Sequence, residues 1–445
     1  MATVEELEAA GVRILRLVYA DLHGKQRGKD VLLERAGHAI AHGKPFVEAV
    51  MTIDNSHNIV SGEAEGFRDL VAKPDLKTAR INPLDPEVAV VICDLSSVPS
   101  HRPSGLDSRG SLKRICARYA KLGLTPVVAH ELEFYLLERD AEALGGLRPM
   151  TMRDSSVYTV GPLADPTGIV RAMFDACDAF QLEPISMAQE YGHSQNEINL
   201  THGEAVEATD RAFLFKALVK QMADMDGIVA TFMGMPADDD ESSGYHLHAS
   251  LVDKAGKNVF DAPRAQDGLS PIAHHFIAGV LEHAPAMAGL LNPTVNSYKR
   301  IINGGLSPKF ANWGYDNRMA MLRISEERGS AARAEVRSAD GAANAYLIAA
   351  TILAAGLDGI ERKLKPPKPV VGNFYAGPPA AMGAQLPTSL GAALDALEAD
   401  TRLVKLVGPA LIETFLSIKR YELGRWEAQQ NRLTAWELEE YAEAL

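Results

Sequence analysis

The chain has 445 residues, of which 47% are hydrophobic and 23% charged, and its formal net charge is −13. This length predicts two domains, and the acidic balance without a basic run argues against nucleic acid or an anionic membrane as a partner. No signal-like or membrane-spanning apolar stretch occurs, and three cysteines at unrelated spacings predict neither a disulfide framework nor a thiolate metal cluster. The cytoplasm is therefore the expected compartment.

The first hundred residues predict a small β-rich domain. Residues 13–33 hold two alternating apolar segments around His23 and Gly24, a pattern typical of a hairpin. The β-rich unit continues through 48–51 and closes with the apolar run 88–93. Residues 99–107 are dense in Pro, Ser and Gly, which is typical of a connector. We therefore place one domain at 1–100 and a larger one at 101–445.

Helical and extended patterns follow one another in the larger domain. Helices are expected from residue 108, over 165–180, over 208–226 and over 271–284, where Pro285 stops the pattern. Strands are expected over 127–137, 183–188 and 228–232, and residues 333–356 predict a strand followed by a very apolar helix. The acidic run 238–241 is typical of a solvated loop, and the tail beyond 387, including 436–445, is expected to be helical.

The expected strand 127–137 carries two carboxylates. Because side chains alternate along a strand, Glu131, Glu133 and Tyr135 share one face, and Leu132 and Phe134 share the other. Two neighbouring carboxylates on an apolar strand repel each other and lose hydration unless a cation or basic partners compensate. The pattern fits a metal site, and it also fits a strand face open to water.

Further carboxylates and imidazoles occur in groups that a strand or turn could present together: Glu190 with Glu197, His246 with His248, and Glu335 between Arg333 and Arg337. Carboxylates with imidazole and no thiolate suit Mg²⁺ or Mn²⁺ better than zinc or copper. Each group alone is also typical of a structural histidine or of an exposed, salt-bridged strand. Spacing does not show that the groups converge.

A series of ordered blocks gives the sequence a family resemblance. The blocks are YADLHGKQRG, HELEFYL, GHSQNEINL, ATFMGMP, SSGYHLHASL, NPTVNSYKR, NWGYDNR, AEVRSADGAANAYL, NFY and LPTSLGAAL. From about Val12 to the C-terminus the chain resembles the glutamine synthetase family. The resemblance implies an α+β fold, with a small β-grasp N-terminal domain and a catalytic domain that holds a curved antiparallel sheet among helices.

The same resemblance implies a ligase that couples ATP cleavage to amide formation on the γ-carboxylate of glutamate. It also implies a homo-oligomer of two stacked hexameric rings, with active sites between neighbouring subunits and two or more Mg²⁺ or Mn²⁺ ions in each. In the family's pattern Glu133, Glu190 and Glu197 would hold one metal on the glutamate side. Glu131, His246 and Glu335 would hold another beside the ATP phosphates.

The basic residues of these blocks have counterparts in the family. Arg318, Arg323 and Arg333 resemble its phosphate-facing arginines. Arg300 and Arg337 resemble those that bind the carboxylates of glutamate, a role suited to the planar guanidinium group. His248 and Ser250 match positions near the nucleotide. Together with Asp54, Arg300 and Arg318 are our candidate catalytic residues.

The sequence departs from the ammonia-using pattern of the family at three places. MTIDNSHN stands where a DGSS-like loop is expected, leaving Asp54 as a positional substitute, and Leu306 stands about where a flap glutamate would fall. Glu241 and Ser242 replace an Asn-Gly pair that lines the glutamate site. Capture of ammonium needs carboxylates to bind the cation and take its proton, whereas a leucine provides an apolar wall.

These departures predict a γ-glutamylamide synthetase that joins glutamate to an organic amine, such as an alkylamine, ethanolamine or a polyamine. An ammonia-using glutamine synthetase is the main alternative. A metal-dependent amidohydrolase would have no need of five arginines in these blocks, and a catalytically silent structural or sensing relative would have no need of all six candidate metal ligands. Tyr375 occupies a position that is adenylylated in some relatives, but its flanking residues differ, and we do not predict that modification.

Overall fold

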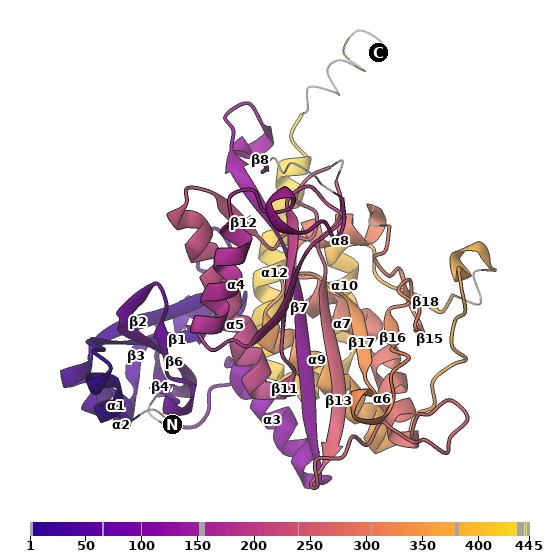
Figure 1. The fold of residues 1–445 in the computed structure, drawn as a ribbon, viewed down its shortest axis with the longest axis horizontal. Coiled ribbons are helices and arrows are strands. Elements are labelled where there is room, and N and C mark those ends of the chain that lie inside the picture. Colours follow the sequence, from indigo (N-terminus) through magenta and orange to yellow (C-terminus); the bar gives the residue numbers. More distant parts are fainter. Residues whose placement is uncertain are drawn as a thin grey trace.

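Two main sheets and the helices packed on them make up the molecule, which confirms the predicted α+β class (Figure 1). The computed structural model describes residues 3–64, 66–98, 100–150, 156–238, 240–303, 305–378 and 382–433, together with 440 and 442. Within these ranges a third, two-stranded sheet pairs β14 (Phe310–Ala311) with β18 (Ala384–Gln385).

The first sheet comes from the N-terminal hundred residues. Its order is β2 (Gln26–Leu32), β1 (Ile14–Ala20), β6 (Asp85–Ser97), β4 (Asp69–Pro74) and β3 (Lys44–Val47), with β5 (Arg80–Asn82) paired to β6. β1 and β2 form the predicted hairpin, and β6 contains the predicted strand 88–93. Helices α1 (Val4–Ala9) and α2 (Gly37–His42) complete this part. The expectation that 48–51 continues the sheet was wrong, because Glu48–Thr52 is a 3-10 helix that packs against α12 (Pro409–Gln430).

The hairpin turn contacts the rest of the chain at Gly24. Its φ of +78° is a conformation that glycine adopts without strain. A Cβ at this position would lie 2.8 Å from the Cα of Asn344, so glycine also permits the close approach of the two segments. Asn344 donates a hydrogen bond from Nδ2 to the backbone oxygen of Asp21 at 3.0 Å. The turn is thereby fixed against the segment that follows the large sheet.

The large sheet surrounds one long strand, β7 (Leu124–Arg139). Its order is β15 (Trp313–Tyr315), β16 (Leu322–Ile324), β17 (Ala334–Ala339), β13 (Tyr245–Asp253), β7, β10 (Gln195–Leu200) and β9 (Pro184–Gln189). Three short strands also pair with β7: β8 (Leu147–Pro149), β11 (Gly203–Glu204) and β12 (Val229–Thr231). All of these pairs are antiparallel except β15 with β16. The predicted strands 127–137, 183–188 and 228–232 are thus confirmed within a residue or a few.

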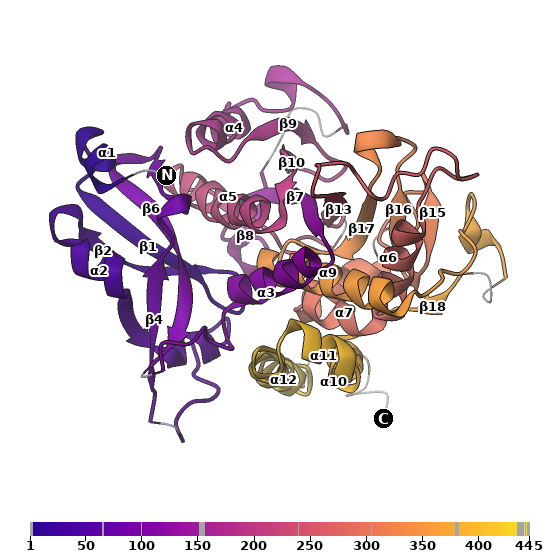
Figure 2. The same cartoon turned by 90° about the horizontal axis from the view of Figure 1, so that it is seen from below.

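Helices pack on this sheet as a second layer. They are α3 (Ser108–Lys121), α4 (Ile169–Ala179), α5 (Ala205–Met225), α6 (Pro271–Glu282), α7 (Ala284–Leu291), α8 (Val295–Asn303), α9 (Ala345–Arg362), α10 (Leu390–Ala399), α11 (Thr401–Val407) and α12. α9 is apolar on all sides because it packs against α3, α5 and α6, and Figure 2 shows it at the centre of the helical layer.

The predicted helices are confirmed with two boundary changes. α4 begins at Ile169 rather than near residue 165, since Gly168 precedes it with a left-handed φ of +75°. α6 ends at Glu282, and Pro285 lies in the first turn of α7 rather than simply ending a helix. The helix expected over 436–445 lies outside the described residues, apart from 440 and 442.

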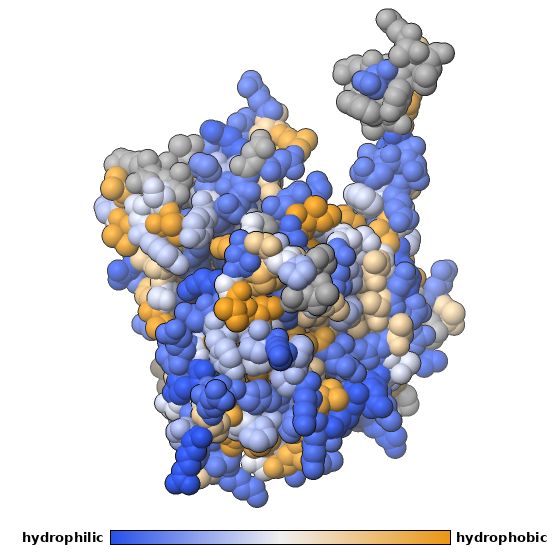
Figure 3. Space-filling model, turned by 90° about the vertical axis from the view of Figure 1, so that its right-hand side faces the viewer, coloured by the Kyte–Doolittle hydropathy of each residue, from blue (hydrophilic) through white to orange (hydrophobic). Residues whose placement is uncertain are grey.

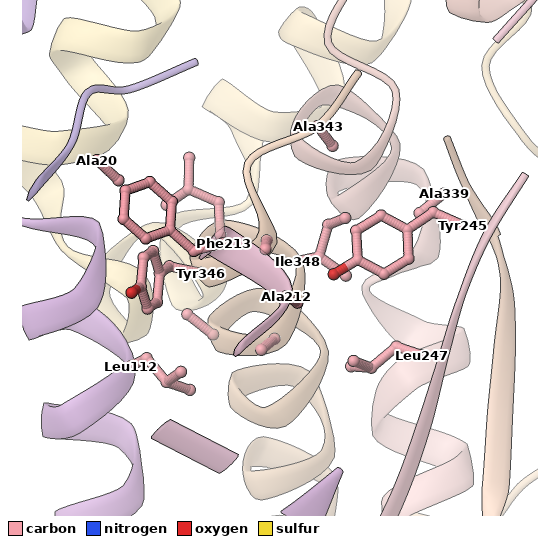
Figure 4. Packing of buried hydrophobic residues seen from close by; sticks show 14 of the residues in the cluster. Ala20, Leu112, Ala212, Phe213, Tyr245, Leu247, Ala339, Ala343, Tyr346 and Ile348 are labelled. Carbon is pink, nitrogen blue, oxygen red and sulfur yellow. The ribbon is translucent and has the colours of Figure 1, made fainter. Parts of the chain in front are cut away.

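The core joins the two layers through large, fully buried side chains. Tyr245 and Leu247 of β13 point toward Ile348 of α9, while Phe213 of α5 lies beside Tyr346 of α9 (Figure 4). The rings of Phe213 and Tyr346 have centroids 5.5 Å apart.

A glycine and a buried histidine hold neighbouring helices together. α6 and α9 cross where a Cβ on Gly279 would lie 2.1 Å from the oxygen of Ala355, so only glycine fits there. His283 follows α6 and lies between Asp358 of α9 and Asp400, the N-cap residue of α11. Burial opposes its protonation, but hydrogen bonds to both carboxylates raise the pKa of His283 above its usual value.

The outer surface is mostly hydrophilic, with small hydrophobic patches on the face drawn in Figure 3. Among the residues that the structure describes, none of the helices combines the length and apolar character that crossing a bilayer requires.

Candidate active site

The central strand β7 presents its carboxylates on one face of the large sheet. Leu132 and Phe134 are fully buried, whereas Glu131 and Glu133 are partly exposed and line a cavity of about 330 Å³. The predicted alternation along this strand is therefore confirmed. Tyr135 continues the same face and donates a hydrogen bond to the backbone oxygen of Glu241 at 2.7 Å.

Strand register brings the other candidate ligands to these two acids. Glu133 lies opposite Glu197 of β10, and Glu131 lies opposite His246 of β13. One strand further, His248 lies opposite Glu335 of β17. Residues separated by up to two hundred positions thus meet because three antiparallel strand pairs share one face.

The first cluster consists of Glu131, His246 and Glu335, which each offer a ligand atom, all within 4.8 Å of one another. His246 Nδ1 lies 3.2 Å from Glu131, and His248 Nε2 lies 2.8 Å from its other oxygen. Although burial disfavours the anion, these hydrogen bonds hold the pKa of Glu131 well below its usual value. Burial likewise opposes ionisation of Glu335, but Arg337 and the histidines lower its pKa to about 2.

The second cluster consists of Glu133, Glu197 and His246, with ligand atoms again within 4.8 Å. Gln195 donates a hydrogen bond to Glu133 at 2.7 Å. Burial and the nearby carboxylates raise the pKa of Glu197 to about 9 and that of Glu190 to about 7. Glu190 lines the same cavity without joining either cluster, and His246 belongs to both.

The two clusters have the donor chemistry of a divalent cation site. They combine carboxylate oxygens with one imidazole, a set that suits Mg²⁺ or Mn²⁺. The raised pKa values of Glu190 and Glu197 show that adjacent carboxylates disfavour one another's ionisation, a cost that cations would remove. The residues therefore fit the metals that the sequence predicts.

The cavity beside the second cluster also contains three of the predicted arginines, Arg300, Arg318 and Arg337. Arg300 is 3% exposed, and within the described part of the chain its Nε and Nη1 have no hydrogen-bond partner. Its Nη2 donates to the backbone oxygen of Arg337 at 3.3 Å. A buried guanidinium group with two free donors is suited to an anionic ligand such as a carboxylate.

A second cavity of about 320 Å³ lies on the other side of Glu131, which lines both cavities. The predicted nucleotide residues His248, Ser250 and Arg333 line it. Arg333 Nε donates to His248 Nδ1 at 3.3 Å. The two cavities are therefore joined at the first cluster.

Two predicted site residues line neither cavity in the single chain, although one of them contacts the first cluster. Arg323 is not among the described residues that line either cavity, since it is bound to Asp316 and, at 2.7 Å, to Glu335. Asp54 is fully buried in the N-terminal part, where it is hydrogen-bonded to Asn58 and paired with Arg425. These contacts give both residues structural roles within the chain.

Aromatic and apolar side chains also line the first cavity. Leu306 is 50% exposed there, with Tyr158, Tyr191, Glu241 and Ser242 in the same lining. The acidic run 238–241 was predicted to be a solvated loop, with Glu241 at the glutamate site; Asp238 and Glu241 are exposed, Glu241 lines the cavity, and His193 N donates to Asp240. Sequence reasoning missed Gln195, Tyr158 and Tyr191, although Gln195 lies inside the GHSQNEINL block and could have been found by its position two residues from Glu197.

The central strand thus carries carboxylates that face two cavities, one of them lined by buried arginines, an arrangement suited to divalent cations and an anionic ligand. Residues 105–441 match the family model for the glutamine synthetase catalytic domain. The chain belongs to the glutamine synthetase family and is a ligase of that family.

Relatives match over nearly the whole chain. A glutamine synthetase of Pyrococcus abyssi is 34% identical, covering 98% of this chain and 99% of the relative. The solved structures "Apo GmaS without ligand" and "GmaS/ADP complex-Conformation 1" are each 30% identical, with a TM-score of 0.87 and complete coverage of both chains. The predicted family and fold are thereby confirmed.

Proposed function

We propose that the protein is an ATP-dependent ligase that activates the γ-carboxylate of glutamate as γ-glutamyl phosphate and joins it to an organic amine. ATP would occupy the cavity lined by His248, Ser250 and Arg333, and glutamate the cavity lined by Arg300 and Arg337. Glu131 lies where the two cavities meet, which is where the γ-phosphoryl group and the γ-carboxylate must approach.

The reaction has two steps. A γ-carboxylate oxygen attacks the γ-phosphorus of ATP, and ADP leaves; the amine nitrogen then attacks the acyl carbon, phosphate leaves, and the nitrogen loses a proton. Arg318 lines the cavity beside the clusters and is suited to stabilise negative charge on the phosphoryl group. Divalent cations held by Glu131, His246 and Glu335, and by Glu133 and Glu197, would supply positive charge that offsets repulsion between the anions.

The observation that favours an organic amine is that Leu306, Tyr158 and Tyr191 line the first cavity. An alkyl group on the acceptor would bury apolar area against these side chains, and the tyrosine rings suit an alkylammonium ion before it loses its proton. Ammonia has no alkyl group to use this surface. Glu190 and Glu241, which line the same cavity, are suited to accept the proton.

Ammonia remains the second candidate because the same two carboxylates could bind ammonium, and because the curated relatives are named glutamine synthetase. The deciding experiment measures ATP-dependent phosphate release with glutamate and a panel of ammonia, methylamine, ethylamine, ethanolamine and putrescine. We expect an organic amine to give the highest kcat/KM. Ammonia as the best acceptor would refute the amine proposal, and no glutamate-dependent release with any acceptor would refute the ligase.

We further propose that the chain assembles as two stacked hexameric rings in the cytoplasm, with residues 1–100 as one domain and 101–445 as the catalytic domain. In such rings the N-terminal sheet of one subunit would cover the open cavity of its neighbour, and the loop at Asp54 would then contribute from a neighbouring subunit. Light scattering on the purified protein tests the mass, and a monomer with full activity would exclude shared sites.

A further inference from the structure

A third cavity, of about 500 Å³, lies away from the two clusters. It is bounded by the turn of the β1–β2 hairpin, by α5, by α12 and by residues 341–344 after β17. Figure 2 shows α5 and α12 on the side of the molecule that carries the N-terminal sheet. Among the described residues, the lining of this cavity contains no carboxylate. It contains four lysines: Lys25, Lys216, Lys220 and Lys419.

Two of these lysines are held against an aromatic ring rather than against an acid. The ammonium groups of Lys216 and Lys220 lie 5.3 and 5.8 Å from the ring centroid of Phe232. Lys216 also donates to the backbone oxygens of Gly341 and Ala343, at 2.6 and 2.9 Å. Within the described part of the chain, Lys220 has neither an ion pair nor a hydrogen bond from its ammonium group.

The other two lysines differ in their partners. Lys419 is 2% exposed and is paired with Glu422 at 2.8 Å, while its Nζ lies 3.1 Å from His23 Nδ1. The ammonium group of Lys25 has no such partner among the described residues. Asp21, in the same turn as Lys25, already accepts hydrogen bonds from the backbone of His23 and Lys25 and from Arg27.

This arrangement concentrates positive charge in a chain whose net charge is −13. Burial, and then Lys220, lower the pKa of Lys216 to about 7, while Asp340 and Asp21 oppose the shift. The four ammonium groups repel one another, and because Lys220 is exposed and Lys25 is partly exposed, an anion from solvent can enter the cavity and offset this repulsion. The side chains of Asn55, Gln221 and Thr294 also line the cavity and offer hydrogen bonds to bound oxygens.

We propose that this cavity is a binding site for a compact organic or inorganic anion with at least two negative charges, carried by phosphate groups or by several carboxylates. Its volume exceeds what a single phosphate ion fills and suits a small metabolite. Binding of the ligand would affect the candidate glutamate site through Lys216. This lysine holds the segment that directly follows Asp340, and Asp340 interacts electrostatically with Arg300. We infer that the site is regulatory, and the inference does not depend on the acceptor amine.

The test uses the assembled full-length protein without ATP or divalent cations. Isothermal titration with pyrophosphate and with citrate compares the wild type with the double variant Lys25→Gln/Lys220→Gln, whose side chains are the two without ion pairs. The variant Lys121→Gln/Lys254→Gln is the matched control, because it removes the same charge from exposed positions outside the cavity.

We expect the wild type and the control to bind at least one of the two anions, and the cavity variant to bind it roughly tenfold more weakly or worse. Loss of pyrophosphate binding alone would assign a phosphate-bearing ligand, and loss of citrate binding alone a polycarboxylate. Equal affinity in all three proteins would overturn the proposal, as would no binding of either anion to the wild type at millimolar concentration.

Discussion

Replacement of Arg300 by lysine tests the glutamate site most directly. The variant keeps the positive charge but loses the planar group whose Nε and Nη1 are free for a ligand. A hydrogen bond to a charged group contributes about 1.5–3 kcal/mol. Loss of one to two such bonds, partly replaced by the ammonium group, predicts a cost of roughly 2–4 kcal/mol, which is about a 30- to 1000-fold fall in kcat/KM for glutamate.

The assay is ATP-dependent phosphate release with glutamate varied at saturating ATP and amine, and then with ATP varied at saturating glutamate. We expect the KM for glutamate to rise and the KM for ATP to stay within a factor of about three, because the nucleotide cavity does not contain Arg300. Arg118→Lys, on the surface of α3, is the control. A fall of less than threefold for glutamate, or an equal rise in both KM values with an unchanged melting temperature, would refute the assignment.

Three further predictions concern acceptor choice, pH and packing. Leu306→Glu should raise the ratio of kcat/KM for ammonia to that for the preferred amine by roughly tenfold or more, measured in the same phosphate-release assay, since a carboxylate replaces the apolar wall. His283→Gln should destabilise the protein most below pH 6.5 and progressively less as the pH rises through the raised pKa of His283, measured as the difference in melting temperature across pH 5.5 to 9. Gly279→Ala should cost about 1–3 kcal/mol by overpacking the crossing of α6 and α9, seen as a lower melting temperature.

Each of these has an internal comparison. Leu163→Glu, at an exposed position outside the cavity lining, should leave the acceptor ratio unchanged, and an equal shift in both variants would contradict the role of Leu306. For His283, a stability difference that grows with pH would reverse the inferred sign. Gly37→Ala has open space around its Cβ and should be neutral or stabilising, so equal melting temperatures for the variants at Gly37 and Gly279 would contradict the packing argument.

The sequence was most informative where local geometry determines the result. Period-two alternation placed Glu131 and Glu133 on one face without knowledge of any partner strand, and the structure has them there. The prediction that 48–51 continues the sheet was wrong because so short an apolar pattern does not distinguish a strand from a 3-10 helix. Either structure can bury Ala49 and Met51. The described residues of the acidic run 238–241 form the predicted loop, with Asp238 and Glu241 exposed, and Glu241 lines the cavity as the family resemblance implies.

Contacts between distant segments could not be obtained from local patterns. The structure brings Glu190 into the same cavity as Glu133 and Glu197, and it places a ligand atom of His246 in both clusters. Which ligand atoms come together depends on strand pairing and on how far each side chain extends from its strand. The spacing of residues along the chain does not determine either quantity. Tyr191 lies between Glu190 and the GHSQNEINL block and could have been found by that position, whereas Tyr158 reaches the cavity from a segment with no expected motif.

Register is the physical condition on which the whole site rests. Glu133 meets Glu197, and Glu131 meets His246, only because β10 and β13 pair with β7 at one particular offset. A slip of one residue on either strand would turn its ligand to the opposite face, where Leu132 and Phe134 are packed in the core. The buried neighbours of the acids therefore fix the metal geometry as much as the acids do. It follows that Leu132→Ala should weaken Mn²⁺ binding, measured by electron paramagnetic resonance, more than an equally destabilising change at Leu112 of α3. Equal losses would show that core stability alone, and not register, controls the clusters.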